Sequence, residues 1–175
     1  MEILSPIGEK TDVIFFYDGF GLNSRGLAQI YIKALCQIKK VIYITYEDCK
    51  ENIPDIQNII NKNDGRILYI NRRQKNYTEQ ILQLCSFASE FKPHDFFFYS
   101  FPNDVVGVTS LNILEGKVTR YQINLTDHAF WLGARCIDKC IEFRDYGANV
   151  SVKYRGICKN IIAKLPFYPI INKDI

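Results

Sequence analysis

The stretch Asp12-Val13-Ile14-Phe15-Phe16-Tyr17 decides the fold, because its nearly unbroken apolar run suits a parallel strand covered on both faces. From Arg25 onward, apolar residues recur at helical spacing, at Leu27, Ile30, Tyr31, Ala34, Leu35 and Ile38. A second β-branched and aromatic run follows at Val41-Ile42-Tyr43-Ile44-Thr45-Tyr46. Residues 12–46 therefore predict one strand–helix–strand unit.

The same alternation continues along the rest of the chain. Pro54 at the first position of a second helix precedes a strand over 66–70, and a helix over 81–91 precedes a strand over 95–99. Three more strands are predicted at 118–125, 140–143 and 160–165, with a brief helix at 129–134. The pattern predicts an α/β fold with a doubly wound, mainly parallel, Rossmann-like sheet of about seven strands flanked by helices.

Composition narrows the classes of function. The 175 residues are 47% hydrophobic and 23% charged, with a formal net charge of +3, which is typical of one globular domain. Lys and Arg are scattered rather than clustered, so nucleic acid is not a predicted partner. The chain shows no secretory leader and no apolar run of about 18 residues, which predicts a cytoplasmic protein, with the inner membrane surface as an alternative place.

The six cysteines are dispersed over a chain that is large enough to fold without disulfides, so free buried thiols are predicted. Cys136 and Cys140 are four residues apart, but neither a CxxC pair nor an HxxxH partner completes a zinc site. No metal site is predicted.

The first candidate site is the loop after the first strand, Asp18-Gly19-Phe20-Gly21-Leu22-Asn23-Ser24-Arg25-Gly26. Its backbone N–H groups and the following helix N-terminus suit a phosphate, although the spacing G-x-G-x-x-x-x-G matches neither the dinucleotide motif nor a P-loop. Alternatively, the glycines only permit positive φ and Asn23 or Ser24 caps the helix. The predicted substrate-binding residues of this loop are Gly19, Gly21, Asn23, Ser24, Arg25 and Gly26.

The second candidate site follows the fifth strand, where Thr126 or Asp127 is expected to cap the brief helix. His128 would then lie in the first helical turn, where the helix dipole disfavours the imidazolium and keeps the ring available as a base. Asp127 is its acidic partner or is itself the base, so both are predicted catalytic residues. A purely structural histidine is the alternative, and we assign His94, at the amino end of the fourth strand, to structure.

Two arginines are the remaining predicted substrate-binding residues. Arg144 and Arg155 suit anionic groups, although a local Arg144–Asp145 pair or solvent exposure is an equal account. The segment Ser100-Phe101-Pro102-Asn103-Asp104, after the fourth strand, offers polar contacts to a sugar, but an Asx-type turn is the favoured interpretation.

Taken together, several of these segments resemble the amino-terminal half of bacterial GT-B glycosyltransferases. The likeness spans most of the chain and is most specific in Asp127-His128-Ala129-Phe130-Trp131-Leu132-Gly133 and in Arg144-Asp145-Tyr146-Gly147. It also includes the glycine loop, Lys153-Tyr154-Arg155-Gly156-Ile157 and Leu165-Pro166-Phe167-Tyr168-Pro169.

The resemblance implies two Rossmann-like domains that face a cleft, the first contacting mostly the sugar acceptor and the second holding the nucleotide-sugar donor. This chain matches only the first, so residues 1–165 are the expected domain and 166–175 the expected connector to a missing donor-binding domain. By position, Gly19, Gly21 and Gly26 approach the donor phosphates or the acceptor, and Asp127 and His128 contribute to the reaction centre. No donor-domain acidic segment occurs before Ile175, so catalysis by the isolated chain is not expected.

The resulting prediction is the acceptor-side domain of a nucleotide-sugar-dependent glycosyltransferase that takes part in cell-surface polysaccharide synthesis. No cofactor is predicted, and no metal bound by a DxD motif, because the sequence has no such motif. The alternatives are a dinucleotide-binding redox domain, with Glu47 or Asp48 on a ribose, and a non-catalytic binding domain. The expected partners are a nucleotide sugar, a sugar acceptor and the donor domain. The apolar residues between 166 and 171 also predict a weak homodimer.

Overall fold

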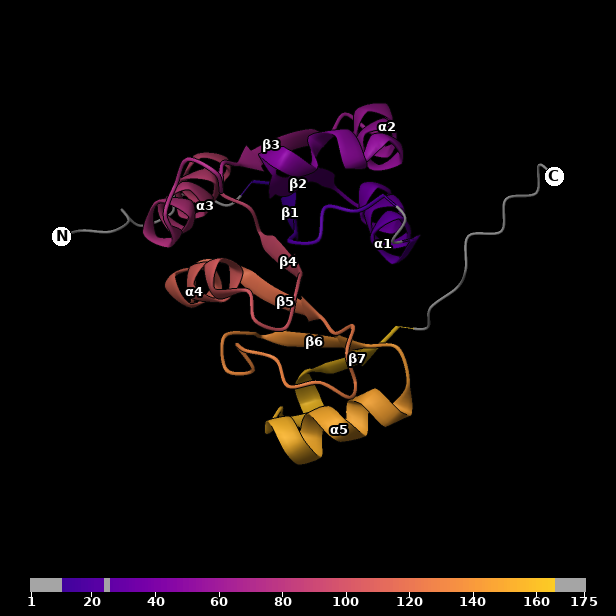
Figure 1. Cartoon of the computed structure of the whole chain (residues 1–175). Helices are drawn as coiled ribbons and strands as arrows, with labels where there is room; N and C mark the ends of the chain where they lie inside the picture. Colours follow the sequence, from indigo (N-terminus) through magenta and orange to yellow (C-terminus); the bar gives the residue numbers. More distant parts are fainter. Residues whose placement is uncertain (1–10, 24–25, 166–175) are drawn as a thin grey trace.

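Seven parallel strands form one sheet, in the order β3-β2-β1-β4-β5-β6-β7, in a computed structural model that describes residues 11–23 and 26–165 (Figure 1). The strands are β1 (Val13–Asp18), β2 (Lys40–Tyr46), β3 (Arg66–Ile70), β4 (Asp95–Tyr99), β5 (Thr119–Ile123), β6 (Lys139–Glu142) and β7 (Ile162–Lys164). The strand order reverses direction between β1 and β4, as in a Rossmann-like sheet. The predicted fold class is thereby confirmed.

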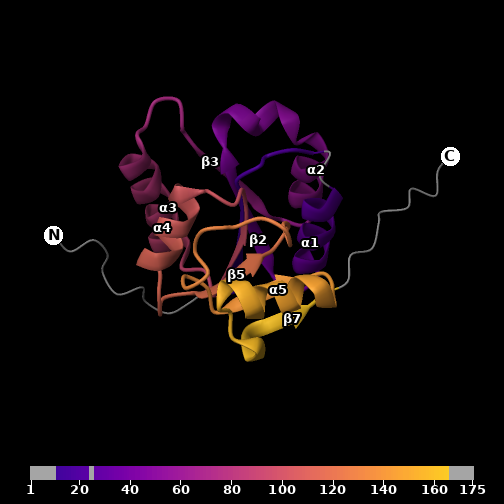
Figure 2. The ribbon, with the colours of Figure 1, turned by 60° about the horizontal axis from the view of Figure 1, so that its bottom comes forward.

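Helices cover both faces of this sheet. They are α1 (Gly26–Cys36), α2 (Pro54–Lys62), α3 (Tyr77–Phe91), α4 (Val105–Ile113) and α5 (Asp145–Arg155), with short 3₁₀ turns at Glu47–Asn52 and Lys159–Ile161. Helices α1 and α2 lie together on one side of the sheet, and α3 and α4 lie together on the other (Figure 2). Alternate residues of β1 follow this division, because Phe15 belongs to one buried apolar cluster and Phe16 to the other.

The predicted strands and the first three helices are confirmed to within a few residues, but two helices were not predicted. Helix α4 is apolar nearly all round, so it shows no helical periodicity. Its Gly107 permits close packing, since a Cβ there would come within 2.1 Å of the Phe98 ring and 3.0 Å of the Tyr17 ring. Helix α5 is missed for the opposite reason, because small and polar residues interrupt its apolar face.

The brief helix predicted at 129–134 is wrong, since residues 124–138 form turns and bends. Its backbone groups are engaged by distant partners instead: the amide of Leu132 donates to the carbonyl of Pro102 at 2.7 Å, and the carbonyl of Ala129 accepts from Arg155 at 2.7 Å. Tertiary hydrogen bonds have replaced the helical ones.

Three further predictions concern the C-terminal connector, membrane-spanning segments and the cysteines. The expected connector over 166–175 lies outside the described residues. None of the described helices is long and apolar enough to cross a membrane. All six cysteines are free thiols, but the prediction that they are buried holds only for Cys49, Cys85 and Cys140, since Cys36 and Cys136 are partly exposed and Cys158 is exposed.

Candidate functional site

The glycine loop after β1 takes its course from the buried carboxylate of Asp18. One oxygen of Asp18 accepts from the amides of Phe20 at 2.9 Å and Gly21 at 3.0 Å, and the other accepts from the hydroxyl of Tyr43 at 2.7 Å. The hydroxyl of Thr45 also donates to the carbonyl of Asp18 at 2.8 Å. Hydrogen bonds from the amides of the loop and from two residues of strand β2 to Asp18 therefore fix the conformation of the loop without the help of a ligand.

Two glycines let this loop lie against the ends of the neighbouring strands. Gly21 has φ +58°, and a Cβ on it would lie 2.5 Å from the Cβ of Cys49. A Cβ on Gly19 would lie 1.8 Å from the hydroxyl oxygen of Ser100. Both positions thus need glycine for backbone conformation or for space, which is the structural alternative weighed for this loop.

The other residues of the loop have separate positions. Asn23 caps α2 rather than the helix that follows the loop, since its side-chain oxygen accepts from the amide of Asp55 at 2.8 Å and its amide group donates to the Asp55 carboxylate at 2.6 Å. The expectation that Asn23 caps α1 is therefore wrong. Gly26 begins α1, and Ser24 and Arg25 lie outside the described residues.

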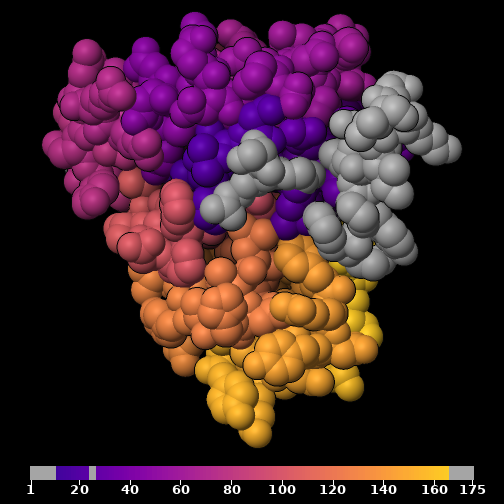
Figure 3. All heavy atoms as spheres, turned by 45° about the vertical axis from the view of Figure 1, so that its right-hand side comes forward, coloured from indigo at the N-terminus to yellow at the C-terminus, as the bar shows by residue number. Residues whose placement is uncertain are grey.

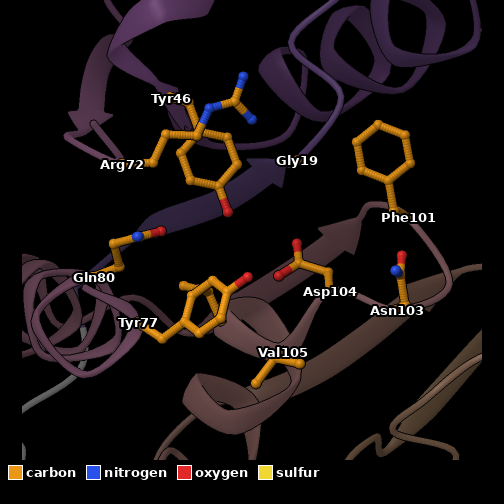
Figure 4. A pocket seen from close by; sticks show the side chains of 10 residues that line it. Gly19, Tyr46, Arg72, Tyr77, Gln80, Phe101, Asn103, Asp104 and Val105 are labelled. Atoms are coloured by element: carbon orange, nitrogen blue, oxygen red, sulfur yellow. The ribbon is translucent and has the colours of Figure 1, made fainter. Parts of the chain in front are cut away.

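A cavity of about 340 Å³ opens where the strand order reverses, at the carboxyl ends of β1 and β4. We call it the switch-point cavity (Figure 4). Its lining residues come from β2, the β1, β3 and β4 loops, and the starts of α3 and α4: Gly19, Tyr46, Arg72, Tyr77, Gln80, Phe101, Asn103, Asp104, Val105 and Val106.

The carboxylate of Asp104 forms one side of the cavity and is held by neutral donors. It accepts from the hydroxyl of Tyr17 at 2.7 Å, from the hydroxyl of Ser100, and from the amide of Gly107 at 2.9 Å. The hydroxyl of Tyr46 donates in turn to Tyr17 at 2.9 Å. Burial, with the nearby charge of Asp104, raises the pKa of Tyr17 well above its usual value and that of Tyr46 to about 12, so both stay protonated donors.

Two aromatic side chains that line the cavity, Tyr46 and Phe101, pack against neighbouring side chains. The guanidinium of Arg72 lies 4.5 Å from the ring centroid of Tyr46, and it also bonds the carboxylate of Asp48 at 2.8 Å. Burial would lower the pKa of Arg72, but the hydrogen bonds and charge of Asp48 outweigh it and raise the pKa. Phe101 packs on Phe20 with 4.2 Å between ring centroids.

The loop after β5 is fixed by Arg155, which projects from the last turn of α5. Its guanidinium donates to the carbonyls of Thr126 at 2.6 Å, Asp127 at 3.1 Å and Ala129 at 2.7 Å. It also donates to the hydroxyl of Ser151 at 2.9 Å. One side chain thus defines the backbone of residues 126–129, which we call the clamped loop.

Two buried carboxylates, one from the clamped loop and one from the end of β6, lie close together beside α5. Glu142 accepts from the amide group of Asn124 at 2.9 and 3.0 Å and from the hydroxyl of Ser151, and Asp127 accepts from Arg144 at 2.6 Å. A Cβ on Gly147 would lie 2.6 Å from an oxygen of Glu142 and 2.7 Å from one of Asp127, so both carboxylates lie against the first turn of α5. The positive end of that helix favours negative charge there.

The side chains of His128 and Phe130, in contrast, project away from this network. His128 is exposed, and Phe130 is 80% exposed. His128 does not lie in a helical turn, so the argument that a helix dipole keeps it neutral does not apply. Thr126 and Asp127 cap no helix at 129–134, and Asp127 binds Arg144 instead.

The structure therefore divides the predicted site residues into groups. Gly19 lines the switch-point cavity, while Asp127, Arg144 and Arg155 belong to the network around the clamped loop. His128 is not among the residues that line the switch-point cavity. Both regions lie at the carboxyl edge of the sheet, and Figure 3 shows the indigo surface of the first strand–helix unit bordering the orange surface of the β5–β6 part of the chain.

The second histidine lies at the other edge of the sheet. The imidazole Nδ1 of His94 is 3.1 Å from the carboxylate of Asp95, at the amino end of β4.

Within the described ranges, no group of three or more His, Cys, Asp or Glu side chains is placed to hold a metal ion.

Sequence reasoning missed most of the switch-point cavity. Tyr46, Arg72, Tyr77 and Gln80 were not candidates, because they come from three distant segments. The signal that was present is the strand–helix alternation, which directs attention to the residues that follow each strand at its carboxyl end, among them those after β4. Asp104 was assigned to an Asx-type turn, but in the structure it caps the unpredicted helix α4 and also lines the cavity.

No protein-family model and no curated protein matches the chain. Among solved structures, the chain is similar to a mutant short-chain dehydrogenase/reductase from Serratia marcescens, at 13% identity and a TM-score of 0.41, over 91% of this chain and 73% of that one. This degree of likeness carries no argument about activity, and the glycosyltransferase resemblance stays a prediction.

Proposed function

We propose that this chain is the acceptor-side domain of a nucleotide-sugar-dependent glycosyltransferase. The observation that carries the proposal is the clamped loop, on which a buried network holds the backbone while the side chain of His128 faces solvent. A hydrogen-bonded backbone with an exposed imidazole at the carboxyl edge of a parallel sheet suits a side chain that acts on a ligand in a cleft.

The two predicted catalytic residues then have different roles. Asp127 is buried and bound to Arg144, so it positions the loop. His128 is left as the side chain that accepts the proton of an acceptor hydroxyl while the hydroxyl oxygen attacks the anomeric carbon and the nucleoside diphosphate leaves. Arg155 is a positioning residue, since its hydrogen bonds go to the loop and to Ser151.

The neighbouring glycine loop adds a second element at the same edge. Its amides at Gly19, Phe20, Gly21 and Asn23 already donate to Tyr99, Asp18 and Asn52, so contact with a phosphate group of the donor falls to the N-terminus of α1. The donor domain itself is expected from the resemblance alone.

The dinucleotide-binding redox domain is the competing function. In such domains a carboxylate after the second strand binds the ribose. Here one carboxylate oxygen of Asp48 is bound by Arg72 at 2.8 Å and lies 3.7 Å from Arg73, while the other is buried and has no hydrogen-bond partner among the described residues. Glu47, the other residue considered for a ribose, is exposed. The redox domain therefore stays the competing proposal, and ligand binding decides between the two.

An NMR titration of the ¹⁵N-labelled chain with UDP-glucose, GDP-mannose, NADH and NADPH tests the proposal. We expect a nucleotide sugar to bind weakly but saturably, because the resemblance assigns most donor contacts to the missing domain, and to shift the amides of residues 126–130 and of Gly19 to Gly21. His128→Ala should weaken this binding. His94→Ala is the matched control, since His94 lies at the opposite edge. Saturable binding of NADH or NADPH without any nucleotide sugar would overturn the proposal, and so would equal effects of the two histidine substitutions.

A further inference from the structure

The switch-point cavity is bordered by aromatic rings whose faces or edges remain accessible. Tyr77, at the first position of α3, is 67% exposed, and Phe101 is 44% exposed. Figure 4 shows Tyr77, Tyr46 and Asp104 directed toward a common space, with Phe101 and Asn103 on the β4 side of it. Large exposed aromatics that border a cavity are typical of a binding site rather than of a core.

The polar groups of the cavity are preorganised and suited to hydroxyl groups. Asp104 is an acceptor held by three donors, and the amide of Asn103 offers both a donor and an acceptor. Gln80 is buried and fixed by its hydrogen bond to the carbonyl of Lys75 at 2.8 Å. A ligand with several hydroxyl groups can donate to the carboxylate and exchange hydrogen bonds with the amides.

The charges of the cavity disfavour an anion. The positive charge of Arg72 is matched by Asp48, whereas the donors to Asp104 are all neutral in the described part of the chain. A phosphate or carboxylate that entered would therefore approach an uncompensated negative charge, which is repulsive at short range. The same argument disfavours the pyrophosphate of a dinucleotide.

We infer that the switch-point cavity binds an uncharged saccharide, whose apolar ring face packs on Tyr77 or Phe101 and whose hydroxyl groups reach Asp104 and Asn103. The inference rests on the proposed function, in which this saccharide is a sugar unit of the acceptor other than the one whose hydroxyl group meets His128, because His128 does not line the cavity. The volume of about 340 Å³ falls within the usual range for small-molecule sites.

The test is an NMR titration with neutral probes: the methyl glycosides of glucose, galactose, mannose and N-acetylglucosamine, together with maltose and lactose. We expect at least one of them to shift the amides of Gly19 and Asn103 saturably. Tyr77→Ala should weaken this binding about 3- to 10-fold, the factor expected for one aromatic contact, while Tyr77→Phe should retain it. Tyr154→Ala is the matched control, because Tyr154 is an equally exposed tyrosine on α5.

Charge provides a second and independent readout. Glucose 6-phosphate should bind more weakly than methyl glucoside, and the difference should narrow in Asp104→Asn, whose side-chain oxygen can still cap α4. The inference is overturned if none of the neutral probes binds saturably, if Tyr77→Ala and Tyr154→Ala behave alike, or if glucose 6-phosphate or adenosine binds more tightly.

The two proposals can fail separately. The two titrations share the amide of Gly19, so saccharide binding is distinguished by the amide of Asn103 and nucleotide-sugar binding by the amides of residues 126–130. Loss of the saccharide signal with an intact nucleotide-sugar response would reject only the saccharide site. Binding of NADH with an intact saccharide response would reject the glycosyltransferase.

Discussion

Substitution of Gly21 by alanine should destabilise the chain for two reasons that can be measured separately. Gly21 has φ +58°, a conformation that costs an L-residue about 1–2 kcal/mol. The added Cβ would also lie 2.5 Å from the Cβ and 2.6 Å from the sulfur of Cys49, and such overpacking costs about 1–3 kcal/mol. We therefore expect Gly21→Ala to lower the free energy of unfolding by about 2–5 kcal/mol.

Gly116→Ala is the matched control for the conformational part. Gly116 has φ +70°, but a Cβ there would meet no atom within 4 Å. It should therefore lose only about 1–2 kcal/mol. Urea unfolding followed by circular dichroism gives both values, provided that the dependence on urea concentration is unchanged between the variants.

A double-mutant cycle isolates the steric part. Cys49→Gly removes both atoms that approach nearest to the new Cβ, so the loss in Gly21→Ala should be smaller in this background. Equal losses for Gly21→Ala and Gly116→Ala, together with additivity in the cycle, would refute the packing explanation and leave the positive φ as the reason for glycine at this position.

Three other perturbations probe the rest of the molecule. Asp138→Asn removes the partner of the buried Arg120 and should cost about 2–3 kcal/mol at pH 7, a value below that of a fully buried pair because Asp138 is partly exposed. Hydrogen bonds from Arg120 lower the pKa of Asp138 from 3.8. The stability that the ion pair contributes is therefore complete above pH 3.8 and is lost as the pH falls through the lowered folded-state pKa. Unfolding curves at pH 7 and at low pH should show that the difference in stability between the parent and Asp138→Asn becomes smaller in acid. Arg155→Met should cost about 2–4 kcal/mol and accelerate amide hydrogen exchange in the clamped loop, whereas unchanged exchange there would contradict its positioning role. His128→Ala should stay within about 0.5 kcal/mol of the parent in urea unfolding, since the side chain is exposed, and a larger loss would return it to a structural role.

The strand–helix alternation was readable from local patterns. Buried parallel strands such as β1 and β2 are continuous apolar runs, and α1 carries a periodic apolar stripe. Each of these elements can therefore be recognised from a short stretch of sequence. Local patterns failed where the packing is unusual. Helix α4 is apolar nearly all round, so it shows no helical period. The segment at 129–134 is not helical because distant partners bind its backbone, for example Arg155 at the carbonyl of Ala129, and such partners cannot be read from the local sequence.

The candidate sites divide in the same way. The sequence by itself determined the parallel Rossmann-like sheet and the carboxyl-edge loops that carry Gly19 and His128, because strand and loop identity depend on neighbours in the chain. Only the tertiary structure decided that Asp127 and Arg155 hold a loop in place, and that Tyr46, Tyr77 and Asp104 meet at one cavity. These residues are joined by the order of strands in the sheet, and that order follows from how buried faces pack together rather than from any local pattern.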